Sequence, residues 1–184
     1  MNLDLLANEL LLDLFEYQSG VHLLRTFHNL NSRFDNLLIV HFQTHDLDFR
    51  SLSTYTFDII CEQHLPLIAD RIITLRLPNN DDTPQEIELF LADDFALRTF
   101  LHLRSPSLDR IYSIETMNKV TRQCCHLPYL IHLKFMSCSL NCNRAIRLDT
   151  FNQIWSLPKL TRCHLDIKIY KRFVIPTVHR RRSL

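Results

Sequence analysis

The residues best suited to chemistry in this chain are cysteines and histidines in its second half. Cys124, Cys125 and His126 are followed by Cys138 and Cys142, and thiolates and imidazoles are the usual zinc ligands. However, the spacing Cys-Cys-His followed by Cys-x3-Cys matches no common zinc pattern. Cys124 fits the apolar face of a helix and Cys138 fits a turn, as expected for free cysteines that pack like small apolar residues. We therefore expect no metal and no cofactor.

The sequence contains no arrangement that is typical of an enzyme. Its 10 histidines are scattered, and no cysteine–histidine or paired-carboxylate spacing indicates nucleophilic or acid–base chemistry. Phosphate-binding loops and the serine-hydrolase elbow need glycines, because the backbone must approach a ligand closely or turn sharply. The chain has 1 glycine, Gly20, so these classes are excluded. We expect a protein that is not an enzyme.

Composition limits the possible partners and compartment. A net charge of +1 gives no reason to expect nucleic acid. Apolar runs are shorter than the ~20 residues of a membrane helix, and the opening "MNLDLLANE" lacks the basic region of a secretory signal. The 6 cysteines without a signal indicate reduced thiols. We expect a cytoplasmic or nuclear protein that binds neither nucleic acid nor membrane.

A leucine-rich pattern recurs along the chain at nearly constant spacing. Residues 130–140, "LIHLKFMSCSL", fit L-x-x-L-x-L-x-x-C-x-L at every position. Weaker copies begin at Phe42, Ile72, Leu103 and Leu160. The five starts are thus separated by 30, 31, 27 and 30 residues. Each L-x-L segment has the period of a strand, and the ninth position, Asn80 or Cys138, can satisfy backbone groups where the strand turns.

Helices are predicted between these copies, because apolar residues recur there at helical spacing. The helical segments are residues 53–64, 83–91, 113–124 and 148–155. The third should bury Ile114, Met117, Val120 and Cys124. The fourth should bury Leu148, Phe151, Ile154 and Trp155. The sequence therefore predicts a strand–helix repeat.

This pattern resembles the leucine-rich repeats of the long type, with about 27 residues per repeat, over residues 42–166. The resemblance implies an α/β fold in which parallel strands line the concave side of a short solenoid and helices lie outside. An ordinary α/β domain with coincidental leucine spacing is the alternative. The expected neighbouring parallel strands, in sequence order, are Ile72–Leu77, Leu103–Leu108, Leu130–Phe135 and Leu160–Leu165. Pro106 should shorten or break its strand, because it lacks an N–H donor.

Strand alternation divides the side chains of these segments between a core and a concave face. Leu75, Leu133 and Cys163 should stack in the core. The concave face should bind a target protein through charged and hydrogen-bonding side chains. Its expected residues are Thr74, Arg76, Ser105, Ser107, Asp109, His132, Lys134, Met136, Arg162, His164 and Asp166.

The first 40 residues predict three short helices, the first capped by Asn8, the second at Val21–Phe27 and the third around residues 30–38. This segment resembles the F-box, the helical motif that docks on the SKP-type adaptor of cullin–RING ubiquitin ligases. Ala7 and Phe34 stand where the family has proline and tryptophan. The resemblance assigns adaptor binding to Leu6, Glu9, Leu10, Leu14, Phe15, Leu23, Leu24 and Phe34. Because Leu10, Leu14 and Tyr17 share a different stripe from Leu11 and Phe15, we expect part of this apolar set to be exposed.

The resemblances imply an F-box-like segment at residues 1–40, a leucine-rich-repeat solenoid at residues 41–167 and a basic, disordered tail at residues 168–184. They imply a substrate-recognition subunit of an SKP–cullin–F-box ubiquitin ligase, which would hold an unidentified target protein near the ubiquitin-charged enzyme. The alternative is a free-standing leucine-rich-repeat interaction module with no link to a ligase.

Overall fold

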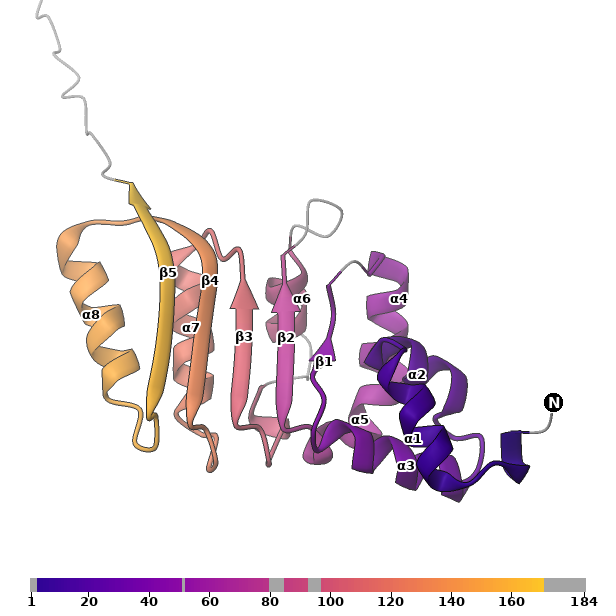
Figure 1. Cartoon of the computed structure of the whole chain (residues 1–184). Helices are drawn as coiled ribbons and strands as arrows, with labels where there is room; N and C mark the ends of the chain where they lie inside the picture. Colours follow the sequence, from indigo (N-terminus) through magenta and orange to yellow (C-terminus); the bar gives the residue numbers. More distant parts are fainter. Residues whose placement is uncertain (1–2, 51, 80–84, 93–96, 171–184) are drawn as a thin grey trace, which may run out of the picture.

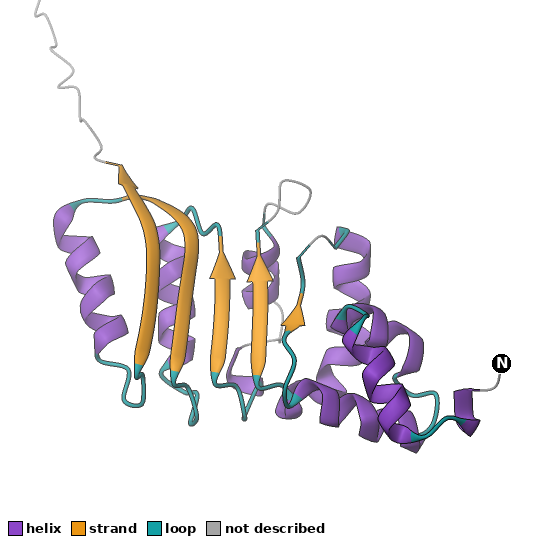
Figure 2. Cartoon of the chain, viewed as in Figure 1, coloured by secondary structure: helices purple, strands orange, loops and turns teal. Residues whose placement is uncertain are grey.

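Five strands form one parallel sheet in sequence order (Figures 1 and 2). The computed structural model describes residues 3–50, 52–79, 85–92 and 97–170. The strands are β1 (Leu47–Asp48), β2 (Thr74–Pro78), β3 (Ser105–Asp109), β4 (His132–Asn141) and β5 (Arg162–Tyr170). The fold is α/β, and the predicted parallel order of the strands is confirmed.

Helices connect the strands and cover one face of the sheet. They are α1 (Asn8–Glu16), α2 (Gly20–Phe27), α3 (Ser32–Phe42), α4 (Thr54–Ile59), α5 (Leu65–Ile68), α6 (Glu86–Ala92), α7 (Ile114–Cys124) and α8 (Arg144–Trp155), with a π-helical turn at Ile60–His64 and short 3-10 turns at Leu3–Leu5, Ala69–Arg71 and Leu97–Thr99. Figure 1 shows α6 and α7 behind the strands and α1–α3 beyond β1. No described helix lies in front of β2–β5, so we call this side of the sheet the open face.

Polar side chains fix where most helices begin. Ser19, Asn31, Ser113 and Asn143 each accept a hydrogen bond from a backbone N–H of the helix that follows, as expected for N-caps. The prediction that Asn8 caps the first helix is wrong, because the N-cap residue is Ala7 and it makes no side-chain bond.

Asn8 instead joins two helices. Its Oδ1 accepts a hydrogen bond from Arg33 Nε at 2.8 Å. Arg33 Nη2 also donates to the carbonyl of Leu6. The start of α1 is therefore held on α3, and the two helices form one unit with α2. We call this unit, Asn8–Phe42, the helical segment.

The core lies between the sheet and the helices. Leu75 and Leu133 are fully buried and lie in register with one row of core residues, and Cys163, opposite Leu133, is half-buried. The four predicted core residues of α7 are all buried. In α8 the predicted face is only partly correct, because Thr150 and Ile154 are buried while Leu148 and Trp155 are exposed.

A polar contact explains the orientation of α8. Thr150 Oγ1 donates a hydrogen bond to Asn118 Oδ1 of α7 at 2.8 Å. This bond turns the Thr150 side of α8 toward α7. The apolar spacing of residues 148–155 could not predict that Thr150 is buried, because threonine is not counted as a core residue in such a pattern.

The first predicted repeat is misplaced by two residues. Leu47 of β1 lies opposite Leu75 of β2, whereas a copy starting at Phe42 would place His45 there. Phe42 belongs to α3, whose length carries the helical segment past residue 40. At the other end β5 extends to Tyr170, so Lys168 belongs to the sheet and not to a tail. Residues 171–184 lie outside the described residues.

Pro106 affects only one side of its strand. β3 is continuous over five residues, and β2 pairs with it through Leu75 and Pro106. Pairing with β4 begins only at Ser107. The prediction of a short or broken strand is therefore wrong for the strand itself. The missing N–H interrupts the ladder with β4, because the carbonyl of Arg104 before it already accepts from Ile131 N and His132 N.

Asn79 satisfies backbone groups at the end of β2, a role that the sequence assigns to its neighbour Asn80. Its side chain is buried, and its Oδ1 accepts from Ile87 N at 3.0 Å. Its Nδ2 donates to the carbonyl of Arg110 at 3.2 Å. One amide thus ties β2 to α6 and to the turn after β3. Asn80 lies outside the described residues.

Candidate interaction surfaces

Four residues that the sequence assigns to adaptor binding instead hold the helical segment together. Phe15, Leu23, Leu24 and Phe34 are each at most 1% exposed. Phe27 bridges two of them, with ring centroids 5.1 Å from Phe15 and 5.1 Å from Phe34. This burial corrects the expectation, because a side chain inside the core cannot contact a partner.

The remaining apolar stripe of α1 is exposed. Leu10 is 52% exposed, Leu14 48% and Tyr17 84%, and Glu9 is exposed beside them while Leu6 is half-buried. Leu11, on the other stripe, is buried with Phe15. The expectation that part of this apolar set is exposed is therefore confirmed, and the structure divides it into one packed and one exposed stripe. We call Leu10, Leu14 and Tyr17 the α1 stripe.

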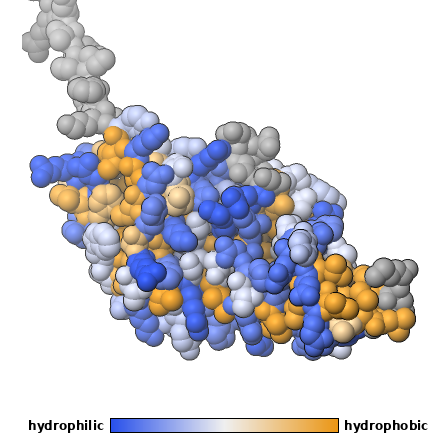
Figure 3. Space-filling view, viewed as in Figure 1, coloured by the Kyte–Doolittle hydropathy of each residue, from blue (hydrophilic) through white to orange (hydrophobic). Residues whose placement is uncertain are grey.

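An apolar hollow adjoins the α1 stripe. Its volume is about 400 Å³. Residues from the beginning of the chain, from α1 and from α2 line it. The lining residues are Leu3, Leu11, Leu14, Phe15, Tyr17, Gln18, His22, Thr26 and Phe27. Figure 3 shows hydrophobic residues gathered at this end of the molecule. Stripe and hollow together form a surface that an apolar side chain of a partner can enter.

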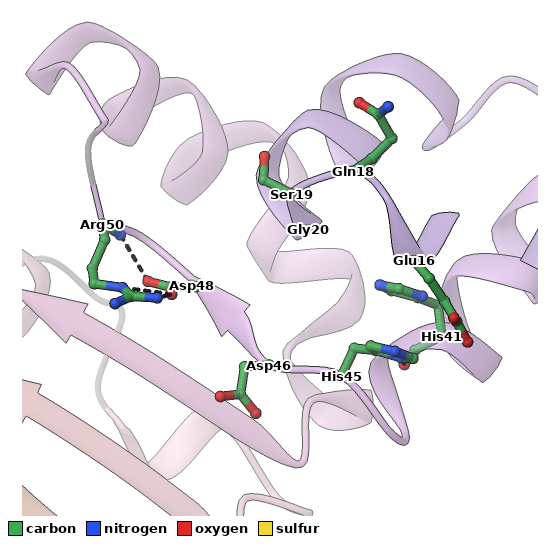
Figure 4. A pocket seen from close by; sticks show the side chains of 9 residues that line it. All are labelled: Glu16, Gln18, Ser19, Gly20, His41, His45, Asp46, Asp48 and Arg50. Atoms are coloured by element: carbon green, nitrogen blue, oxygen red, sulfur yellow. Dashed lines mark hydrogen bonds and ion pairs between the residues drawn. The ribbon is translucent and has the colours of Figure 1, made fainter. Parts of the chain in front are cut away.

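A second, polar hollow lies where the helical segment meets β1 (Figure 4). Glu16, Gln18, Ser19 and Gly20 line it from the helical segment, and Asp46, Asp48 and Arg50 line it from β1 and its flanks. His41 and His45 complete it, with their rings stacked at 4.1 Å between centroids and 1° between planes.

His41 acts in this hollow as a packing group. The side chain is 4% exposed and meets the ring of Phe15 edge-on at 6.0 Å. Burial, and then the neighbouring His45, lower the pKa of His41 to about 4. The imidazole is therefore neutral at pH 7, and the described lining includes no serine–histidine or cysteine–histidine contact that indicates catalysis.

A second histidine pair joins the helical segment to the π-helical turn. His28 Nδ1 and His64 Nδ1 are 2.9 Å apart, so one ring donates and the other accepts. Burial lowers the pKa of His64, and the nearby His28 and Arg25 lower it further. The bond requires at least one neutral ring, so this contact also depends on pH.

The open face carries the residues that the sequence assigns to target binding. Register places Thr74 opposite Ser105, Arg76 opposite Ser107 and Ser107 opposite Lys134. It also places Asp109 opposite Met136, His132 opposite Arg162 and Lys134 opposite His164. β4 has a β-bulge between Phe135 and Cys138. There, Asp166 Oδ2 accepts a hydrogen bond from Ser137 N at 3.0 Å. The predicted residues therefore share one face, although target binding itself stays a prediction.

The open face is electrostatically divided along the sheet. At β2 and β3, Arg76 Nε lies 3.5 Å from Asp109 Oδ2, and Ser107 Oγ donates to Asp109 Oδ1 at 3.2 Å. At β4 and β5, Lys134 and Arg162 are exposed and form no ion pair with any described residue. The β4–β5 half therefore carries the positive charge that is available to a partner.

Two further residues near the open face, Asp48 and Arg50, were not predicted from the sequence. Asp48 lies opposite Arg76, and its carboxylate pairs with Arg50 at 2.6 Å and raises the pKa of that guanidinium. The alternation of Leu47 and Phe49, both buried, with Asp48 and Arg50 was the available signal. It was missed because the first repeat was placed two residues too early.

The cysteines do not gather into a metal site. All six are free thiols, and no group of three metal-ligating side chains occurs among the described residues. Burial raises the pKa of Cys124 to about 12 and that of Cys138 to about 11. These thiols are protonated at pH 7 and pack as apolar groups.

No family model, curated protein or solved structure matches this chain. None of the described helices is long and apolar enough to cross a lipid bilayer.

Proposed function

We propose that this protein is a substrate-recognition subunit of an SKP–cullin–F-box ubiquitin ligase. In this proposal the helical segment is a degenerate F-box and β1–β5 with their helices are leucine-rich repeats. Support comes from the order of the parts, a three-helix unit followed by strand–helix units whose parallel strands are neighbours in sequence order. The protein has no catalytic role of its own and brings a target near another subunit's chemistry.

The observation that carries the proposal is the α1 stripe. A helix that only packs on its own chain needs one apolar stripe, and α1 has a second one that leaves Leu10 and Leu14 about half exposed. The apolar hollow beside Leu14 extends this surface. An adaptor helix can bury both, and the buried apolar area is the source of the affinity.

The open face is the proposed target surface. Its side chains are mostly polar, as the hydrophilic surface over the strands in Figure 3 shows. A mixed polar surface of this kind suits an extended protein segment better than a small cofactor, because small-molecule sites are concave and mostly apolar. Lys134 and Arg162, which are exposed and have no ion-pair partner among the described residues, are two predicted target-binding cations that are available to the target.

Co-purification tests the ligase link. The tagged full chain, expressed with an SKP-type adaptor and a cullin, should bring down both. A Leu10→Ala/Leu14→Ala variant should bring down less of either, while a matched Leu67→Ala/Leu101→Ala variant, in which leucines on other elements are 61% and 53% exposed, should behave like the wild type. If neither adaptor nor cullin accompanies the wild-type chain, the ligase proposal is wrong.

The target surface is tested separately with the partners that the wild-type chain captures. Reversal of two exposed cations of the predicted target surface, Lys134→Glu with Arg162→Glu, should abolish target capture and leave adaptor binding unchanged. Arg76 is left intact because it is half-buried against Asp109, and its reversal would disturb folding. Unchanged target capture by the double variant would place the target site elsewhere.

A free-standing interaction module is the second candidate, and one observation favours it. The helical segment covers the β1 end of the sheet, and Leu47 and Phe49 are 0% exposed there. Repeat arrays need such an end cap whether or not it binds an adaptor. Under this alternative the open face still captures a protein, but no adaptor or cullin accompanies the chain.

A further inference from the structure

The outer edge of β5 is a long strand edge that no other described strand pairs with. β5 has nine residues, and its only described neighbour in the sheet is β4. Arg162 N donates inward to the carbonyl of Ile131. Since backbone groups alternate between the two sides of a strand, the N–H and C=O groups of Cys163, Leu165, Ile167 and Ile169 point outward.

The side chains of β5 also lack cover on this side. Leu133, Phe135, Cys138 and Leu140 of β4 are each 0% exposed, whereas Cys163, Leu165, Ile167 and Ile169 in register with them are only half-buried. On α8, Leu148 and Trp155 are exposed at the same end of the molecule. An unpaired, partly apolar edge of this length is a template for another strand.

The strand that fits this edge best is β5 itself. The opposite edge of the sheet cannot serve, because β1 has two residues and lies beside the helical segment. Two copies of β5 can pair around a two-fold axis, which closes the contact and uses up both edges. This pairing is antiparallel, because the axis reverses the direction of the second strand.

Charge selects the register of this pairing. With Ile167 opposite Ile167 of the second copy, Asp166 of each chain lies opposite Lys168 of the other, and Leu165 lies opposite Ile169. With Asp166 on the axis, two carboxylates would face each other, and with Lys168 on the axis, two ammonium groups would do so. With Leu165 on the axis, Arg162 would face Lys168. Cross-strand opposite charges are favourable and like charges are unfavourable.

We propose that the protein forms a homodimer in which the β5 edges of two copies pair antiparallel about Ile167. The two sheets then become one continuous sheet of ten strands, with the open faces side by side. The row from Leu165 to Ile169 becomes as buried as the row on β4. Each dimer presents two helical segments at its far ends, so it can hold one target between two adaptor sites, if the proposed function is correct.

Sedimentation equilibrium of the full chain tests the dimer with charge variants. Asp166→Lys alone places lysine opposite lysine twice and also removes the hydrogen bond from Ser137 N, whereas Lys168→Asp alone places aspartate opposite aspartate twice and leaves that bond intact. Each should raise the dimer dissociation constant by ~10-fold or more. An equimolar mixture of the two variants restores two opposite-charge pairs and should form a heterodimer with near wild-type affinity. Lys119→Asp, which makes the same charge change on the exposed side of α7, should have no effect.

The outcomes separate the possible occupants of the edge. A wild-type chain that is monomeric at the highest soluble concentration overturns the proposal, and protected amides at Leu165, Ile167 and Ile169 in that monomer would identify residues 171–184 as the cover. A dimer that tolerates both single variants, or whose variants are not rescued by mixing, overturns it in favour of another interface. None of these results depends on adaptor or target binding, so the dimer and the ligase proposal can fail independently.

Discussion

The two ends of the sheet are closed in different ways. At β1 the flanking residues Leu47 and Phe49 are fully buried, and the helical segment lies against that end. At β5 the residues equivalent to the buried row of β4 are half exposed, and α8 leaves Trp155 63% exposed. The same alternation of apolar and polar residues thus gives fully buried apolar side chains at one end and half-exposed ones at the other. The reason is that burial depends on what lies beside the strand.

The difference separates the roles of apolar residues at the two ends. Near β1 the flanking residues of the sheet are buried, and the exposed apolar residues belong to the α1 stripe of the helical segment. Near β5 the exposed residues belong to the sheet layer itself, so the partner that covers them must extend that layer. The two proposals accordingly assign a helical adaptor to one end and a strand to the other.

The largest expected difference between the two ends is in the loss of stability when one aromatic residue is truncated at each end. Phe34→Ala should lower the free energy of unfolding by ~3–5 kcal/mol, because Phe34 is 1% exposed in the helical segment. Trp155→Ala should change it by less than about 1 kcal/mol, although tryptophan is larger, because its side chain is already mostly in water. Urea denaturation of the two variants measures both values. Equal losses would show that α8 is covered in the monomer.

Acid should weaken the β1 end more than the β5 end. The pKa of His41 is lowered to about 4 from its unfolded value near 6.5, so its contribution to stability is complete above pH 6.5 and is lost as the pH falls toward 4. The loss should reach ~3 kcal/mol. Unfolding free energies at pH 7, 5.5 and 4 measure it.

The variant His41→Gln isolates this residue. Glutamine does not titrate, so the variant should lose part of the pH dependence while its stability at pH 7 falls through lost ring packing. Hydrogen exchange should locate the acid-induced opening in α1–α3. An identical pH dependence in the variant would assign the acid sensitivity to other groups, of which His64 is the next candidate because its pKa is also lowered.

A smaller effect is expected at the only glycine. A methyl group on Gly20 would lie 2.8 Å from Cε1 and 3.4 Å from Cζ of Phe42, a ring that is 2% exposed. Gly20→Ala should therefore cost ~1–3 kcal/mol through overpacking, even though alanine favours a helix over glycine. Thermal denaturation of the variant measures the cost. A more stable variant would show that the ring of Phe42 moves aside freely, and that the contact between α2 and α3 is loose.

Much of the sheet could be predicted from the sequence, because regular spacing and strand alternation determine it. The strands containing Leu75, Leu108, Leu133 and Leu165 lie in the expected order and orientation. The first strand was misplaced because Phe42 and Leu47 have the spacing of a repeat, although Phe42 is the last residue of α3 and packs near Gly20. The role of Asn79 could not be predicted, because its side-chain partners are Ile87 of α6 and Arg110 after β3, which are distant in the sequence.

The candidate surfaces were less predictable than the fold. The open-face residues follow from alternation alone, so they could be listed in advance. The residues of the helical segment could not be sorted into buried and exposed ones by their resemblance to a motif. Phe15, Leu23 and Leu24 fit the motif as well as Leu10 and Leu14 do, and only the packing of α1 on α2 and α3 distinguishes the buried from the exposed residues.

The most direct test of the account is a binding titration of the full chain with a purified SKP-type adaptor. The wild-type chain should bind, and Leu10→Ala/Leu14→Ala should bind ~10-fold or more weakly, since each truncation removes ~1–2 kcal/mol of buried apolar surface in the complex. Circular dichroism should show both chains folded, because the altered leucines are about half exposed. Equal affinity of the two chains, or no binding by the wild type, would contradict the account and leave the helical segment as an end cap of the sheet.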